Sequence, residues 1–390
     1  MTDRDAAADH MHAFAERTGL TADRPPDRYL WTDAFAVCNF LGLARETDRR
    51  ARYLELARRL VDQVHHTLGR FRDDDDREGW LSGLSGREAE AHPTRGGLRI
   101  GKPLPERDPG EPMDRRQEWD RDGQYFHYNT KWMVALDFLA RATGKAKYNR
   151  WARELAEASY EGFTYRIDGP TAPRMYWKVR VDLSGPLVDS MGQHDPLDGY
   201  GTYRQLAATA EEMGADGGPG LDDAIASFAT MLAGQRLTTT DPLGLGGLLI
   251  AADREARLLA TADEPDPTVL GDILAAADDG LDRDNPDSEL DRPAARRLAF
   301  RELGLAIGLH GVEQLRTAAD DTPRLFPVDS VRRRHLDALT NYLDVRGRIV
   351  SYWQRSDPRN TETWTGHQNI NQVMLATALA PSGCLIPPEV

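Results

Sequence analysis

Hydrophobic residues recur along the chain in two alternating patterns, and each is typical of a helix. The first is apolar on nearly every face, as in residues 123–144, where Trp132, Leu136 and Leu139 follow helical spacing and further apolar residues fill the other faces. The second is apolar on one face and charged on the other, as in residues 148–163. A helix without a polar face must be buried. We therefore interpret the first kind as inner helices and the second kind as outer helices.

The two kinds of helix alternate along the whole chain. Inner helices are predicted at residues 31–43, 123–144, 195–208, 241–252, 301–315 and 366–379. Outer helices are predicted at residues 6–18, 53–68, 148–163, 221–232, 269–281 and 331–342. With the N-terminal helix as the outer partner of the last inner one, this order predicts a closed ring. Glycines on the inner helices, such as Gly246, Gly304 and Gly308, predict close packing of backbones, since glycine otherwise weakens a helix.

Two segments depart from the helical pattern. Residues 69–123 are rich in glycine, proline and charge. Loops longer than about 15 residues are uncommon unless they serve as lids or binding loops. We therefore expect this segment to cover a site. Residues 174–183 alternate apolar and polar side chains, which predicts an exposed edge strand in one short β-hairpin.

The alternation of inner and outer helices resembles the (α/α)6 toroid of the six-hairpin glycosidase superfamily, which also includes sugar epimerases and polysaccharide lyases. The resemblance covers nearly the whole chain and rests on architecture. It implies an all-α fold in which residues 1–390 form one toroidal domain, with residues 69–123 as a rim or lid insertion. The sequence contains no catalytic signature of one member family, so the reaction stays open.

Composition narrows the possible partners. The formal net charge of -14 and the pI near 5.2 argue against a nucleic-acid or anionic membrane surface, because both require a basic face. No targeting segment or membrane span is expected, so we predict a cytoplasmic protein. The cysteines Cys38 and Cys384 form no disulfide framework. The expected partner is a small molecule, with the oligomeric state left open.

The inner helices of such a ring all begin at the same rim, so their first turns predict a site. Helix N-termini present free N–H groups and partial positive charge, which favour anionic or hydroxyl-rich ligands. The candidate catalytic residues are Asp33, His127, Tyr128, His194, Asp198 and Glu302. The candidate substrate-binding residues are Trp31, Tyr125, Asn129, Trp177, Gln193, Tyr200, Arg301, Trp364, His367 and Asn369, with Arg99 and Lys102 from the long loop.

A short repeat separates capping from chemistry at two of the inner helices. The sequence Asp-Pro-Leu begins at Asp195 and again at Asp241, which predicts both aspartates as N-cap residues. The residue after the motif is Asp198 in the first copy and Gly244 in the second. Capping does not require a carboxylate at this place, so Asp198 is a stronger catalytic candidate.

These residues allow more than one reaction on a carbohydrate. Glycoside hydrolysis needs two carboxylates roughly 5 to 9.5 Å apart, for which Asp33, Asp198 and Glu302 are candidates. Epimerisation or β-elimination needs a proton acceptor and a donor, for which His127 or His194 would serve with Tyr128. Histidine has the suitable unperturbed pKa, near 6.5.

Other chemistries leave weaker signals. Three rim histidines with Asp195 could bind zinc, but they are far apart in sequence, and we expect no metal. No dinucleotide fingerprint, P-loop or nucleophile elbow occurs, so no cofactor is expected. Two alternatives to a carbohydrate enzyme stay open. One is a terpene-alcohol dehydratase or isomerase on the same fold, which an apolar pocket wall would favour. The other is a non-catalytic binding or scaffold protein.

Overall fold

The computed structural model describes residues 2–46, 48–166, 173–284 and 286–390. The chain folds into two compact units. One consists of Ala15–Gln235 and Pro387–Val390, and the other of Met1–Phe14 and Arg236–Ile386. In the following we call them the central unit and the terminal unit.

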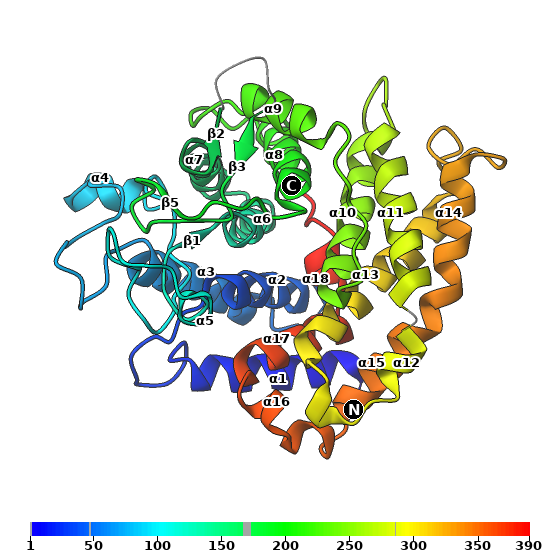
Figure 1. The fold of residues 1–390 in the computed structure, drawn as a ribbon, viewed down its shortest axis with the longest axis horizontal. Helices are drawn as coiled ribbons and strands as arrows, with labels where there is room; N and C mark the ends of the chain where they lie inside the picture. The colour runs from blue at the N-terminus through cyan, green and yellow to red at the C-terminus, as the bar shows by residue number, and fades with distance from the viewer. Residues whose placement is uncertain (1, 47, 167–172, 285) are drawn as a thin grey trace. The chain divides into compact units, whose positions relative to one another are not determined.

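The central unit is built from helical pairs. Its helices are α2 (Leu30–Glu46), α3 (Arg50–Leu68), α4 (Gly86–Ala91), α5 (Arg115–Glu118), α6 (Phe126–Thr143), α7 (Ala146–Phe163), α8 (Asp195–Glu212) and α9 (Asp222–Leu232). The pairs α2 with α3, α6 with α7 and α8 with α9 pack as the sequence predicts (Figure 1). The predicted inner helices also contact one another, because α6 packs against both α2 and α8.

Helix α6 lies at the centre of this unit and is buried over most of its length. Its apolar faces pack against α2, α7 and α8. The buried carboxylate of Asp137 accepts hydrogen bonds from Asn149 on α7 at 3.1 Å and from Gln205 on α8 at 2.8 Å. The helix ends at Gly144, which adopts a left-handed φ of 63° that favours glycine.

A buried histidine on α3 gives a testable pH dependence. The Nε2 of His65 accepts a hydrogen bond from the indole N–H of Trp132 at 3.1 Å, which requires a neutral ring. Burial lowers the pKa of His65 to about 3. The unfolded chain takes up a proton near pH 6.5, whereas the folded chain does not. The stability from His65 is therefore complete above pH 6.5 and falls by up to about 1.4 kcal/mol per pH unit as the pH drops toward 3.

Chemical denaturation between pH 7 and pH 4 measures this effect. We expect the free energy of unfolding to fall less steeply with pH in His65→Gln than in the wild type. Equal slopes for the two proteins would contradict the assignment of a neutral buried His65.

The strands of the central unit are short. They are β1 (Gln124–Tyr125), β2 (Thr164–Tyr165), β3 (Arg174–Met175), β4 (Lys178–Val179) and β5 (Pro186–Val188). Antiparallel pairing gives one sheet with the order β1-β4-β5 and a second sheet of β2 and β3. The prediction of one continuous edge strand at residues 174–183 is wrong. The segment divides between the two sheets, and Lys178, expected on a polar face, is fully buried and ion-paired with Glu118 at 2.9 Å.

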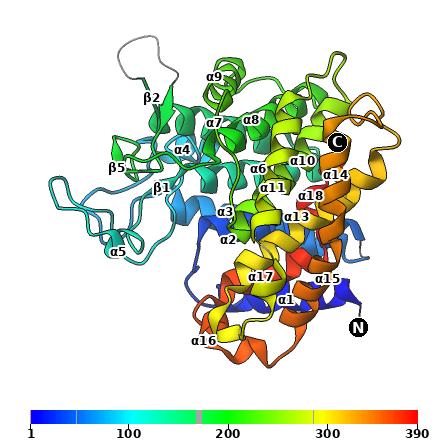
Figure 2. The same ribbon diagram turned by 45° about the vertical axis from the view of Figure 1, so that its right-hand side comes forward.

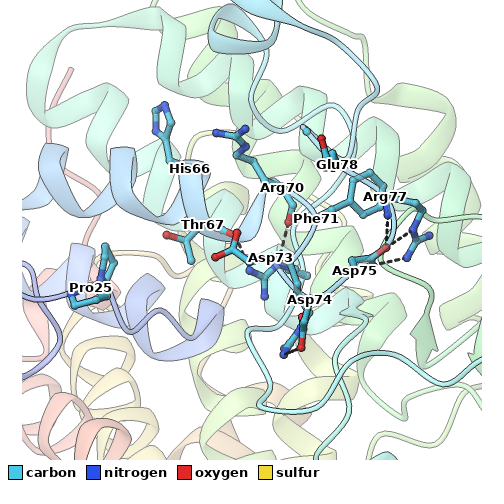
Figure 3. Close-up of a pocket in the computed structure, with 14 residues that line it drawn as sticks. Pro25, His66, Thr67, Arg70, Phe71, Asp73, Asp74, Asp75, Arg77 and Glu78 are labelled. Atoms are coloured by element: carbon cyan, nitrogen blue, oxygen red, sulfur yellow. Dashed lines mark hydrogen bonds and ion pairs between the residues drawn. The ribbon is translucent and has the colours of Figure 1, made fainter.

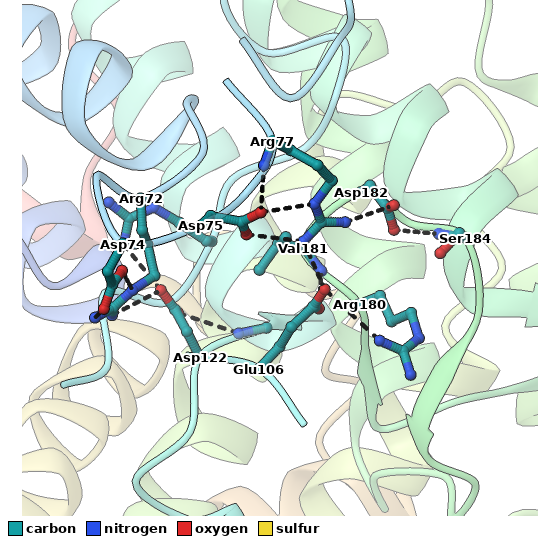
Figure 4. Close-up of polar contacts among 12 residues, drawn as sticks. Arg72, Asp74, Asp75, Arg77, Glu106, Asp122, Arg180, Val181, Asp182 and Ser184 are labelled. Carbon is teal, nitrogen blue, oxygen red and sulfur yellow. Dashed lines mark hydrogen bonds and ion pairs between the residues drawn. The ribbon is translucent and has the colours of Figure 1, made fainter. Parts of the chain in front are cut away.

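The long segment 69–123 is ordered by ion pairs. Figure 4 shows Arg77 bonded to Asp75, Glu106 and Asp182, each at 2.8 or 2.9 Å. Glu106 also accepts the backbone N–H of Val181 at 2.8 Å. These contacts join the segment to the chain that follows β4. Its role as a lid stays a prediction.

The terminal unit is also made of packed helices. They are α1 (Asp3–Arg17, of which residues 3–14 belong to this unit), α10 (Pro242–Ala260), α11 (Thr268–Asp284), α12 (Pro286–Leu290), α13 (Ala299–Ala318), α14 (Val331–Leu339), α15 (Leu343–Gln354), α16 (Glu362–Thr365), α17 (Gln368–Leu379) and α18 (Ser382–Leu385). Short 3-10 turns lie at Ala294–Arg296, Thr340–Tyr342 and Pro358–Asn360. Helix α13 packs against α10 and α17, which agrees with its predicted inner position (Figure 2).

The glycines on α10 and α13 allow these helices to approach closely. A Cβ added at Gly246 would lie 2.1 Å from the carbonyl oxygen of Gly304, and one added at Gly308 would lie 2.7 Å from that of Gly246. Both distances are too short for a side chain, so the predicted close backbone packing is confirmed here. No helix in the described part of the chain is long and apolar enough to cross a membrane.

Candidate active site

A histidine and a buried aspartate face each other across the first turns of α6 and α8. The Nδ1 of His127 lies 3.6 Å from the Oδ1 of Asp195. The imidazole is about 28% exposed, whereas the carboxylate is about 5% exposed. The other oxygen of Asp195 is buried and has no hydrogen-bond partner among the described residues. This arrangement places an accessible imidazole beside a buried carboxylate.

The predicted capping role of Asp195 is wrong. Helix α8 begins at Asp195 itself, and the helix receives no capping hydrogen bond from a side chain at its N-cap, His194. Asp241, in contrast, caps α10 as predicted, because its carboxylate accepts the N–H of Gly244 at 3.0 Å. The same Asp-Pro-Leu sequence thus directs one carboxylate to a helix end and the other to a histidine.

A second pair lies one helical turn further along the same two helices. The ammonium of Lys131 donates to Asp198 at 2.9 Å, and both side chains are about one-fifth exposed. Lys131 follows His127 by four residues, so these two side chains share one face of α6. Asp198 follows Asp195 by three residues, so these two share one face of α8. Asp198, a predicted catalytic residue, is therefore ion-paired with Lys131, which was not among the predicted site residues.

Aromatic rings and one lysine form a closed set beside His127, which we call the aromatic cluster. Its members are Tyr125, Trp177, Trp119, Lys102, Tyr29 and Tyr128. Each contacts the next at 5.1 to 5.7 Å between ring centroids, or between a centroid and the lysine Nζ, and Tyr128 returns to Tyr125. The ring of His127 stacks on Tyr125 at 5.2 Å and meets the edge of Tyr128 at 4.9 Å. Rings at this place can stack on a sugar.

A cavity of about 700 Å³ opens beside the aromatic cluster. Tyr125, Trp119 and Trp177 line it together with Arg107 and Glu118. Trp119 is about 53% exposed although it is a large apolar residue. The wall therefore combines aromatic faces with charged groups.

Two tyrosine hydroxyls of the cluster are bonded to each other. The hydroxyl of Tyr29 lies 2.7 Å from that of Tyr128. Burial raises the pKa of Tyr128 well above its ordinary value, and the neighbouring Tyr29 adds to the rise. The Tyr128 hydroxyl therefore keeps its proton at neutral pH, so it can donate a hydrogen bond and cannot act as a base there.

Three predicted site residues of the central unit make contacts with neighbouring residues of the fold. Asp33 pairs with Arg28 at 3.4 Å and accepts the N–H of Tyr29, and burial raises its pKa to about 6 despite that arginine. Asn129 is buried and donates to Gln124 and Ser159 on neighbouring elements. Trp31 is buried against the ring of Phe35.

Arg99 lies at a different hollow from the aromatic cluster. Its guanidinium donates to Asp122 at 2.8 Å and to the carbonyls of Arg70 and Thr67. It lines a cavity of about 1060 Å³ formed mainly by residues 66–79, which Figure 3 shows. Other predicted residues lie near the start of α8, where Gln193 is exposed and His194 and Tyr200 are half-buried.

The remaining predicted residues belong to the terminal unit. Arg301 is paired with Asp241. Glu302 is buried and accepts two hydrogen bonds from Arg297, at 2.8 and 2.6 Å, and a third from the indole of Trp353 at 2.8 Å. This carboxylate is fixed by its partners, and its predicted catalytic role stays a prediction.

Trp364, His367 and Asn369 lie around the start of α17. Trp364 is buried against Trp353 and lines a cavity of about 310 Å³ with His10 of α1. His367 is exposed, and its ring meets the edge of Phe300 at 5.8 Å, while Asn369 is half-buried. These residues therefore lie at one end of the terminal unit.

Comparison with known proteins shows similarity at the level of the fold. No known family profile and no curated protein sequence matches the chain. The cellobiose 2-epimerase of Spirochaeta thermophila DSM 6192 is similar in structure, with a TM-score of 0.50 and 14% sequence identity over 98% of this chain and 99% of that one. The cellobiose 2-epimerase of Bacillus thermoamylovorans B4167 gives a TM-score of 0.44 and 12% identity over 88% and 86% of the two chains.

The similarity to the first of these enzymes extends over nearly the full length of both chains. It agrees with the alternation of inner and outer helices seen in each unit. The predicted all-α fold class is confirmed. The chain therefore has an (α/α)6 toroid fold.

Proposed function

We propose that this protein is a carbohydrate-active enzyme that epimerises or isomerises a sugar by proton transfer, with His127 as the acid–base group. The observation that carries the proposal is the pairing of a partly exposed His127 with the buried Asp195. Histidine is the side chain most often used for such transfer, and a carboxylate near one ring nitrogen stabilises the protonated ring and leaves the other nitrogen for the substrate.

The chemistry of this reaction fits the groups beside His127. A base removes a proton from the carbon next to the carbonyl of the open-chain sugar, and the electron pair moves onto the carbonyl oxygen. In epimerisation the planar intermediate turns its other face to His127, which returns the proton to the same carbon. In isomerisation the proton goes to the former carbonyl carbon, while the proton of the neighbouring hydroxyl moves to the former carbonyl oxygen. No electrons are gained or lost overall in either case. Tyr128 keeps its proton at neutral pH and can donate a hydrogen bond to the oxygen on which charge develops.

The pairing of the carboxylates favours proton transfer by histidine over hydrolysis. Hydrolysis needs one protonated carboxyl group and one free carboxylate across the scissile bond. Each of the three candidates is paired with a cation: Asp33 with Arg28, Asp198 with Lys131, and Glu302 with Arg297. A cation at contact distance occupies oxygens of the carboxylate, which are then not free to face a scissile bond.

Two further observations support a sugar as the substrate. The cavity is lined by Tyr125, on which the His127 ring stacks, and it combines aromatic faces with the charged groups of Arg107 and Glu118, as a sugar site requires. The fold is similar to that of an enzyme named for the epimerisation of cellobiose at carbon 2. We propose that the 69–123 segment, which supplies Trp119 and Lys102 to the aromatic cluster, acts as the lid of this site.

Incubation of the protein with aldoses, ketoses and disaccharides in D2O tests the proposed reaction. Proton NMR should detect loss of the signal of the hydrogen next to the carbonyl, as deuterium replaces it, together with an epimer or isomer. A matched incubation with His127→Gln should leave the signal unchanged. Release of a new reducing end without deuterium uptake would identify a hydrolase and overturn the proposal.

A further inference from the structure

The few lysines of this chain differ in what their ammonium groups contact. The chain has 49 basic residues (Lys and Arg), of which only five are lysines, and two of these, Lys102 and Lys178, lie against rings of the aromatic cluster. Lys131 is paired with Asp198, and Lys178 with Glu118. The ammonium of Lys102 has no hydrogen bond or ion pair at contact distance among the described residues.

Among the described residues, no acidic side chain lies at contact distance from the ammonium of Lys102, so its positive charge is not neutralised directly. Its Nζ lies 5.5 Å from the ring centre of Tyr29 and 5.7 Å from that of Trp119, which is the geometry of a cation beside aromatic faces. Asp122, one of the nearby acids, is bonded to Arg99 at 2.8 Å and lies 3.9 Å from Arg72. The other nearby acid, Asp120, is exposed to solvent. Partial burial lowers the pKa of Lys102.

A second donor of the same cluster also lacks a partner. The residue Tyr125 is only about 3% exposed, and its hydroxyl is buried as well. This hydroxyl nevertheless makes no hydrogen bond to the described residues. Buried polar groups are normally hydrogen-bonded, and leaving one unpaired costs about 1 to 3 kcal/mol. Tyr125 also lines the 700 Å³ cavity beside Trp119 and Trp177.

We propose that Lys102 and the Tyr125 hydroxyl bind an anionic group of the substrate, so that the protein acts on an acidic sugar. The inference rests on the proposed function for the sugar and on these two donors for its charge. A carboxylate or phosphate oxygen accepts hydrogen bonds from both an ammonium and a phenol hydroxyl. The net charge of the chain does not prevent this, because salt screens charges beyond about 8 Å at physiological ionic strength.

Binding to matched sugars tests the inference without depending on turnover. Isothermal titration of the wild type with glucuronate, glucose 6-phosphate and glucose should give tighter binding of at least one anionic sugar than of glucose. Lys102→Met should weaken that binding about 10- to 100-fold, the usual effect of losing a charge-assisted hydrogen bond, and should change glucose binding less than threefold. Lys102→Arg should restore part of the affinity because it keeps the charge.

Lys147 provides a matched control on α7. Its ammonium also lies over aromatic rings, 4.8 Å from Tyr148 and 4.7 Å from Trp151, but not in the aromatic cluster. Lys147→Met should leave the binding of every sugar unchanged. Comparison of the uronate with the phosphate identifies the anionic group, since the preferred one should lose the most affinity in Lys102→Met.

The outcomes separate this inference from the proposed function. Binding of an acidic sugar that depends on Lys102 but gives no deuterium uptake would support the inference and contradict the proposed reaction. Turnover of neutral sugars with no effect of Lys102→Met would support the reaction and overturn the inference. Equal binding of glucose and both anionic sugars by the wild type would also overturn it.

Discussion

Replacing His127 with glutamine is expected to lower turnover by about 10²- to 10⁴-fold, the usual effect of losing a general acid or base. Glutamine keeps hydrogen-bonding capacity and approximate size but cannot transfer the proton. Because the imidazole is partly exposed and has no direct hydrogen bond to Asp195 at 3.6 Å, the fold should tolerate the change. Steady-state kinetics on the sugar identified by deuterium uptake measures the loss, with circular dichroism to verify folding.

Asp195→Asn should also lower turnover, as His127→Gln does. The amide no longer stabilises the positive charge that His127 gains when it takes a proton. Its effect should fall on kcat with little change in KM, since Asp195 acts through His127 as a positioning residue. His66 supplies the control: it pairs with Glu90 at 3.1 Å, and both side chains are about half exposed. His66→Gln should keep full activity. Wild-type turnover in a folded His127→Gln protein would contradict the assignment of the site.

The inner and outer helices could be predicted because burial dictates their composition. Helix α6 is apolar on nearly all faces and is buried, whereas α7 and α3 carry charge on one side. The prediction missed α15, whose sequence follows the predicted outer helix directly. Its buried residues Val345, Ile349 and Trp353 recur at intervals of four, so the helical spacing was present.

The strands and part of the site could not be predicted because they depend on tertiary contacts. A strand of two residues such as β4 has too short a pattern to detect, and its register is set by β1 and β5. The rim positions of His127 and Asp198 follow from helix order, but their partners do not. The sequence predicts Asp195 as a cap and gives no role to Lys131, although the spacing of four residues between Lys131 and His127 places both on one helix face.

The aromatic cluster was predicted in part. The sequence predicts Tyr125, Tyr128, Trp177 and Lys102 as site residues, whereas it gives no role to Tyr29 and predicts Trp119 only as part of the loop expected to cover the site. Tyr29 lies just before α2, and Trp119 just after α5. A sequence carries no signal for the side chains that meet across such loops.

Among the described residues, no group of three His, Cys, Asp or Glu side chains is placed to hold a metal ion.

Removal of Glu302 is expected to destabilise the protein by about 3 to 5 kcal/mol, as is usual when one partner of a buried ion pair is lost. The carboxylate is bonded twice to Arg297, whose side chain is about 2% exposed, and once to the indole of Trp353. Glu302→Ala leaves the guanidinium buried without a counter-charge and the indole N–H without an acceptor. Thermal unfolding should show a midpoint lower by roughly 6 to 20 °C, as expected for a unit of this size.

The same experiment distinguishes a structural role from the catalytic role that the sequence suggested for Glu302. Glu289 is a suitable control, because it pairs with Arg292 at 2.6 Å on the surface, where such pairs contribute about 0 to 1 kcal/mol. Glu289→Ala should therefore unfold close to the wild-type temperature. Glu302→Gln keeps the size and an oxygen acceptor, so its folded fraction should retain turnover per molecule. A stable Glu302→Gln protein without turnover would instead establish the carboxylate as part of the chemistry.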